Sequence, residues 1–306
     1  MADRMSYFNS RALFSGICIS YIFRLTGTSF WISYILGIIL GVIVLLLIKK
    51  VNNCKLVKSF TGFIFALLSG SVLVNMGHTL YLKETPVIFL TVLPLIAAFI
   101  ISNSKKDALK KCAFIFFAYS ILLFFLKILG LYGHINIENL YPVFTSSVKD
   151  ILIGALVVML VSVVPVLSLN DISDKKNIII NYLVSMTTIL FVSFFAISVL
   201  GLKEVELYRY PEYIVLKRIE FLNFINNVDS FFNFAIIVDL IFTMSAGLKN
   251  IEIGGKLGKI ISVTFLFILI NYICYRSSLL LYIYSFLPLI MIIMFMLLLI
   301  PNKRNL

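Results

Sequence analysis

Hydrophobic and polar positions alternate along this chain in long blocks rather than residue by residue. Ten stretches are almost wholly apolar, and short polar segments separate them. Most of these stretches approach the roughly 20 residues that a helix needs to cross about 30 Å of hydrocarbon. The pattern predicts an all-α polytopic membrane protein with ten transmembrane helices, at 8–25, 29–48, 58–81, 86–102, 111–129, 149–168, 178–199, 228–247, 257–275 and 279–300.

Composition narrows the class of protein further. Of the 306 residues, 61% are hydrophobic and 13% are charged, whereas a soluble domain is roughly 45–50% apolar and about a quarter charged. This difference excludes a soluble globular enzyme, a nucleic-acid-binding domain and a disordered protein. The sequence shows no catalytic, cofactor-binding or metal-ligating motif, so we expect no enzymatic activity and no cofactor.

The net charge of +12 has a different explanation from nucleic-acid binding. Lys and Arg lie mostly between the apolar stretches, and every segment that faces the cytoplasm when both termini lie inside is basic, as the positive-inside rule requires. Five spans (8–129) precede the central loop and five follow it (149–300). An odd number of spans per half inverts the second half, so we expect a single domain, 1–306, built as a 5+5 inverted repeat.

The first span is the weakest of the ten. Its continuous apolar run, 12–23, is about 12 residues or ~18 Å long as a helix, which is too short to cross alone. One interpretation is a discontinuous helix broken at Ser15 and Gly16, and the alternative is an interfacial helix that leaves nine spans. The corresponding place in span six holds Ser162 and Pro165. Freed backbone groups are tolerated only beside a cavity or in the protein interior, so both places are candidate substrate sites.

Three stretches resemble a known family. They are the Glu-Thr-Pro turn at 84–86, the run ENLYPV at 138–143 followed by DILIGA at 150–155, and YPE at 210–212 leading to FINNVDSFF at 224–232. In order and position they resemble the spore germination permease family, the membrane B subunit of nutrient germinant receptors, within the amino acid–polyamine–organocation superfamily. Asn227, Ile236 and Thr243 stand where that family often has Arg, Trp and Lys.

The resemblance implies a specific role. It implies a ten-helix inverted-repeat fold, recognition of an amino acid or similar small nutrient, and A-type and C-type receptor subunits as partners in the spore inner membrane. Two other hypotheses remain: an autonomous amino-acid or cation symporter of the cell membrane, and a divergent structural subunit that binds no ligand.

Polar residues inside the spans supply the remaining candidates for a substrate site. Ser71, Asn75 and His78 form a stripe on span three that lines either an outer vestibule or a contact between helices. Asp239 lies near the middle of span eight, where a carboxylate is costly. It binds a substrate ammonium, a cation or a proton, or else it locks helices together.

The segment 203–225 is too polar to be a span. Pro211 can begin a helix, and apolar residues then recur at helical spacing to Ile225. The spacing predicts an outer interfacial helix that acts as a lid or docking surface, with a solvated loop as the alternative.

Overall fold

The computed structural model describes residues 4–48, 51–52, 54–144, 146–170, 174–219 and 229–300, and within these ranges the secondary structure is helical, without strands. The longer helices are α3 (Phe30–Leu47), α4 (Lys55–Met76), α5 (Val87–Asn103), α6 (Lys106–Leu131), α7 (Val148–Leu169), α8 (Lys175–Leu200), α11 (Asp229–Lys249), α12 (Gly255–Tyr275) and α14 (Leu287–Leu299). The shorter ones are α1 (Met5–Arg11), α2 (Ile19–Thr26), α9 (Leu202–Leu207), α10 (Pro211–Leu216) and α13 (Ser277–Ser285).

Seven helical segments are long and apolar enough to cross a membrane. They cover Ile19–Leu47, Lys55–Tyr81, Ala108–His134, Val148–Leu169, Lys175–Leu200, Phe231–Lys249 and Leu257–Tyr275. The first of them joins α2, the second half of predicted span one, to predicted span two, and the other six correspond to predicted spans three and five to nine. Predicted span ten is a pair of helices bent by 56°, α13 and α14, and predicted span four is the shorter apolar helix α5. The all-helical fold with several membrane spans is thus confirmed, whereas the number ten and the 5+5 repeat remain predictions.

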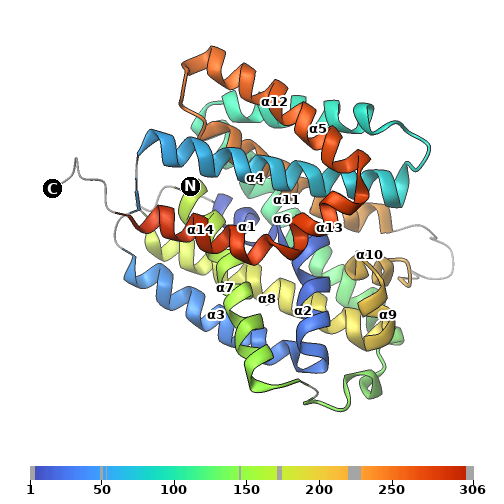
Figure 1. The fold of residues 1–306 in the computed structure, drawn as a ribbon. Helices are drawn as coiled ribbons and strands as arrows, with labels where there is room; N and C mark the ends of the chain where they lie inside the picture. The colour runs from blue at the N-terminus through green and yellow to red at the C-terminus, as the bar shows by residue number, and fades with distance from the viewer. Residues whose placement is uncertain are drawn as a thin grey trace.

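Predicted span one is two short helices at the centre of the molecule. α1 packs against α7, α8 and α11, and Figure 1 shows it enclosed by the longer helices. Every residue of α1 is buried, and Tyr7 and Phe8 have no exposed surface. An interfacial helix would expose one face, so the interfacial alternative is wrong for α1, whereas the number of spans stays a prediction.

Two helix crossings bring backbones into direct contact. A Cβ atom on Gly62 of α4 would lie 2.5 Å from the carbonyl oxygen of Gly247 on α11, which no real side chain tolerates. A Cβ atom on Gly37 of α3 would lie 2.6 Å from the Cβ of Val158 on α7. Small residues at such crossings allow the close packing that holds helices together in lipid.

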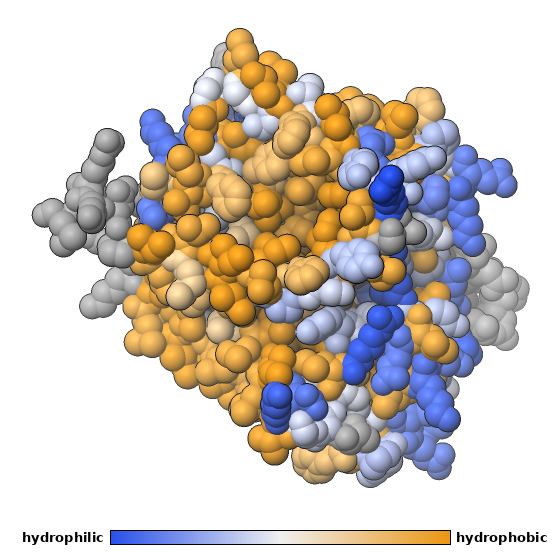
Figure 2. All heavy atoms as spheres, in the orientation of Figure 1, coloured by the Kyte–Doolittle hydropathy of each residue, from blue (hydrophilic) through white to orange (hydrophobic). Residues whose placement is uncertain are grey.

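The surface is apolar over most of its area. Figure 2 shows a broad hydrophobic face, and its hydrophilic residues gather at the right edge, where Figure 1 places α9 and α10. Exposed large side chains such as Leu93, Phe125 and Leu257 belong to this apolar surface. A soluble protein rarely exposes so large an apolar area, whereas a lipid-facing surface requires it.

The segment 203–225 differs from its prediction. A helix does begin at Pro211, but it ends at Leu216 and is buried, with Glu212 only 4% exposed. α10 packs against α2, α8 and α11 instead of lying on the surface. The apolar spacing that predicted an interfacial face therefore marks contacts with the protein interior. Residues 220–225 lie outside the described part of the chain.

Candidate functional site

The helix break predicted at Ser15 and Gly16 is present. Between α1 and α2, Ser15 (ψ 123°) and Gly16 (φ 84°) leave the helical conformation. Gly16 occupies the left-handed region that favours glycine, and a Cβ atom there would lie 2.9 Å from both the Tyr210 ring and a Val72 methyl group. The break frees backbone groups from helical hydrogen bonds, and these groups need other partners.

Glu212 supplies one such partner. The Gly16 N–H donates to Glu212 Oε1 at 2.6 Å, although α10 is almost 200 residues away in sequence. The second oxygen, Oε2, is buried and accepts no hydrogen bond. Burial raises the pKa of Glu212 to about 7, against the lowering effect of its own backbone N–H, the Gly16 N–H and the Lys127 charge.

A closed cavity of about 20 Å³ adjoins this contact. Its polar lining consists of Arg11, Ser15, Lys127 and Glu212, and apolar side chains of α6, α8, α10 and α11 complete the wall. Lys127 is 8% exposed, and its Nζ lies 5.6 Å from the centroid of the Phe232 ring. The volume suffices for about one water molecule. The cavity thus combines a carboxyl group and cations in a space too small for an amino acid.

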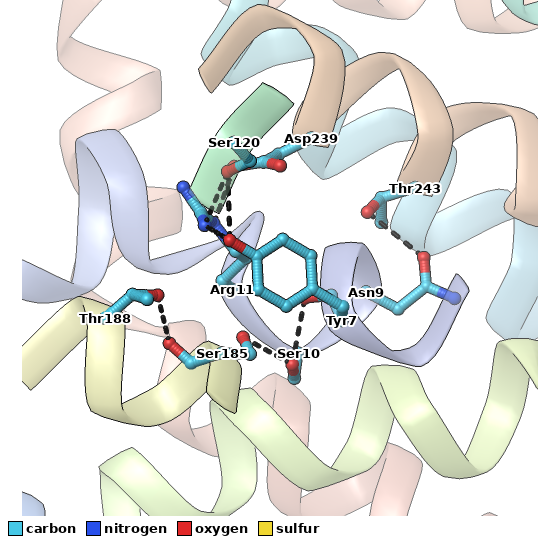
Figure 3. Close-up of polar contacts among 9 residues, drawn as sticks. All are labelled: Tyr7, Asn9, Ser10, Arg11, Ser120, Ser185, Thr188, Asp239 and Thr243. Carbon is cyan, nitrogen blue, oxygen red and sulfur yellow. Dashed lines mark hydrogen bonds and ion pairs between the residues drawn. The ribbon is translucent and has the colours of Figure 1, made fainter. Parts of the chain in front are cut away.

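Arg11 of α1, which lines the cavity, forms an ion pair with Asp239 of α11. Arg11 Nε lies 2.8 Å from Asp239 Oδ2, and both side chains are buried. Arg11 Nη1 also donates to Ser120 Oγ at 3.1 Å and to the Tyr7 hydroxyl, as Figure 3 shows. The Tyr7 and Ser120 hydroxyls are themselves 2.9 Å apart. Arg11 therefore joins α1 to α11 through Asp239 and to α6 through Ser120.

Weaker polar contacts extend this network to α8. Ser10 donates to Ser185 Oγ at 2.7 Å, and Thr188 donates to the Ser185 carbonyl at 2.6 Å. At the far side of Figure 3, Thr243 donates to Asn9 Oδ1 at 3.2 Å. These bonds satisfy buried hydroxyls, and they fix α1 from several directions.

The predicted interruption of span six is wrong. α7 runs unbroken from Val148 to Leu169 through Pro165. Proline removes one N–H from the helix, and the buried neighbours of α7 keep the remaining turns in place. Ser162 Oγ donates to the Val158 carbonyl at 2.7 Å and lies 3.0 Å from the Tyr182 hydroxyl. The hydroxyl groups of Ser162 and Tyr182 thus contribute to helix packing. Because α7 is continuous, Ser162 and Pro165 do not form a second helix break opposite the one at Gly16.

Two residues of the span-three stripe have separate roles. Ser71 donates to the Leu67 carbonyl of its own helix at 2.7 Å. Asn75 Oδ1 accepts from Arg209 Nη1 at 3.1 Å and from the Tyr210 hydroxyl. Asn75 therefore anchors the start of α10 to α4. Among the predicted site residues, the cavity lining includes Ser15, Gly16 adjoins it, and Asp239 is held beside it by Arg11.

Three charged residues of this site were not predicted: Arg11, Lys127 and Glu212. Each was counted with the charges of the segments between spans. A usable signal existed for Lys127, which lies inside the apolar run 111–129, because a cation within a span rarely faces lipid. Arg11 likewise lies within predicted span one, just before its apolar run 12–23, whereas Glu212 lies inside the polar segment 203–225, where the sequence offers no comparable signal.

The arrangement is that of a permease-like membrane protein, in which an interrupted helix meets a buried polar cavity. A family model described as Spore germination protein matches residues 59–256, about two thirds of the chain, and the chain belongs to the spore germination permease family. No curated protein matches the chain. Family and fold together make it a multi-pass membrane protein related to germinant receptors.

The stretches that carry the family resemblance make structural contacts, and one of their residues, Glu212, lines the cavity. Asn139 Nδ2 donates to the Ser198 carbonyl at 2.9 Å and so fixes the central loop to the end of α8. Gly154 packs against α3, since a Cβ atom there would lie 2.9 Å from Ser33 Oγ. The Tyr210-Pro211-Glu212 motif carries the Asn75 anchor and the carboxyl group at the break. Residues 220–228, with Asn227, lie outside the described residues.

Proposed function

We propose that this chain is the membrane-embedded, permease-like subunit of a germinant receptor, and that it binds an amino acid or similar small nutrient beside Gly16. One observation carries the proposal: in a member of this family, the broken helix adjoins a buried cavity with Lys127 and a Glu212 oxygen that accepts no hydrogen bond. A zwitterion offers complementary charges to both groups, and a buried charge gains most from such a partner.

The present cavity represents a closed form of this site. A ligand enters only if α1–α2, α10 or both shift, and a ligand drives that shift only through a higher affinity for the open form. We propose that A-type and C-type subunits in the spore inner membrane convert the shift into a germination signal. The ten-span 5+5 arrangement with cytoplasmic termini belongs to the same proposal, and no catalytic step is part of it.

Germination of spores tests this function. Disruption of the gene should abolish the response to one nutrient, and the intact gene should restore it. Lys127→Met should fail to restore the response although the protein is present in the membrane, whereas Lys203→Met, which alters an exposed lysine of α9, should restore it. Normal germination of the disrupted strain with every nutrient, tested in a strain without related receptors, would contradict the proposal.

An autonomous symporter is the second candidate. The observation that favours it is the carboxyl group of Glu212, whose raised pKa of about 7 suits exchange of a proton at neutral pH. Amino-acid uptake by the purified chain alone, in proteoliposomes with a pH gradient, would support this alternative. Absence of uptake, together with a nutrient-specific germination defect, would support the receptor subunit.

A further inference from the structure

We propose that Glu212 is a built-in ligand of this protein: its carboxyl group occupies a carboxylate-binding position at the Gly16 N–H, and α10 must withdraw before any other carboxylate can bind there. This inference rests on the proposed function only for the identity of the nutrient. The carboxylate-binding position and its internal occupant follow from contacts within the chain.

The position at Gly16 has the features of an anion site. The backbone break presents an N–H that no helical carbonyl accepts, and the Lys127 ammonium lines the adjoining cavity. A backbone N–H and a nearby cation are the groups that commonly bind a carboxylate. The acceptor present is a carboxyl oxygen at 2.6 Å, a distance typical of a strong hydrogen bond.

Glu212 is poorly satisfied in the place that it occupies. Its Oε2 is buried and accepts no hydrogen bond, although a carboxylate can accept several. A carboxyl group with a purely structural role would normally have both oxygens paired, because an unpaired buried oxygen is costly. A free carboxylate that also contacts Lys127 would satisfy the site better than Glu212 does, and it can therefore displace Glu212.

The segment that carries Glu212 is suited to withdrawal. α9 and α10 are helices of only six residues each, too short to be stable without tertiary contacts. Their polar anchors are the bonds of Arg209 and Tyr210 to Asn75, the bond of Arg24 Nε to the Glu206 carbonyl at 3.0 Å, and the Glu212 contact itself. Loss of the Glu212 contact leaves α10 with the polar bonds at its start and with the packing of Tyr213 against Tyr81.

Accessibility of Ser15 measures withdrawal directly. Ser15 lines the cavity and is 3% exposed, so a cysteine there is protected while α10 stays in place. In a full-length chain whose four native cysteines are replaced, Ser15→Cys should react slowly with a maleimide. Addition of Glu212→Ala should raise the rate about tenfold, the change expected on loss of one buried hydrogen bond. Glu212→Gln, which keeps an acceptor, should give a smaller rise.

Three controls make the result specific. Glu204→Ala removes an exposed carboxylate from the same segment and should leave the rate unchanged. In the Glu212→Ala chain, acetate should fill the vacated position and slow the labelling, whereas acetamide, its neutral analogue of similar size, should not. Chloride at equal ionic strength should also have no effect.

Each outcome decides the inference. Equal labelling of the Glu212 variants and the parent would refute internal occupancy, and faster labelling that acetate and acetamide affect equally would refute the carboxylate site. Because acetate replaces the nutrient in this assay, the result is independent of the receptor role. Acetate protection combined with normal germination of the disrupted strain would uphold the internal ligand and contradict the proposed function.

Discussion

The Arg11–Asp239 ion pair gives the sharpest test of how the centre of the protein is held together. Both side chains are buried, and the pair joins α1 to α11. Removal of one partner leaves the other as an uncompensated buried charge, which typically costs about 3–5 kcal/mol. Replacement of both partners by uncharged residues of similar size costs much less, because no charge is then left in the interior.

We therefore expect Arg11→Met and Asp239→Asn each to lower Tm by roughly 6–10 °C, at about 2 °C per kcal/mol. The double variant should recover a large part of this loss, which corresponds to a coupling energy of at least about 2 kcal/mol. The measurement is thermal unfolding of the purified protein in detergent at constant pH and salt. Arg276→Met, which removes an exposed arginine, is the matched control and should change stability by no more than about 0.5 kcal/mol.

A double variant that loses as much stability as the sum of the single variants would refute this reasoning. The same variants also separate the two roles predicted for Asp239. If Asp239 locks helices, Asp239→Asn impairs the nutrient response because the protein loses stability. The double variant then regains both stability and the nutrient response. If Asp239 binds the ligand, the response shifts while Tm stays constant, and the double variant remains defective.

Three further predictions concern the break, the carboxyl group and the helix contact. Gly16→Ala should lose about 1–3 kcal/mol because alanine is strained at a positive φ, while Gly77→Ala, with open space around its Cβ, should lose nothing in the same unfolding assay. Burial raises the pKa of Glu212 to about 7, so the closed form is favoured below the ordinary pKa of the carboxyl group and is weakened as pH rises through about 7. The rate of maleimide labelling of Ser15→Cys, divided by the rate for an exposed cysteine at the same pH, should therefore rise with pH. A ratio of the two rates that does not change with pH would contradict this. Ser162→Ala should destabilise the protein by about 1–3 kcal/mol because it leaves the Tyr182 hydroxyl unpaired. The dose–response curve for the nutrient should stay unchanged. A shifted curve at unchanged Tm would make Ser162 a ligand contact.

The spans and the helix break are predictable from the sequence where the physical constraint that determines them is local. Apolar length identifies most of the spans because hydrocarbon thickness sets a minimum helix length. The break at Gly16 was predictable because the apolar run is short and glycine permits conformations that other residues avoid. The continuity of α7 through Pro165 was not, since it depends on packing from all sides, and Ser162 bonds to its own turn instead of stabilising a break.

Contacts between distant segments were beyond prediction for a different reason. Glu212 meets Gly16 across almost 200 residues, and nothing in the local pattern distinguishes it from a solvated loop carboxylate. The apolar spacing after Pro211 predicts a helix with one apolar face, but the helix ends at Leu216 and packs against the protein interior rather than the membrane interface. Arg11 shows the same limit: its charge suggested a loop, whereas Asp239 allows it to lie at the centre.

The close crossings of α3 with α7 and of α4 with α11 determine which parts of the molecule are able to move. At Gly37 and at Gly62 no layer of side chains separates the two helices, so neither pair can slide without a clash, and each shifts as one unit. α1 contacts both α7 and α11, and its continuation is interrupted at Gly16. The two helix pairs are therefore the units that a change of shape at this interruption would move against each other. Under the proposed function, we expect a larger residue at Gly62 to spread one pair and to weaken the germination response more than it weakens nutrient binding.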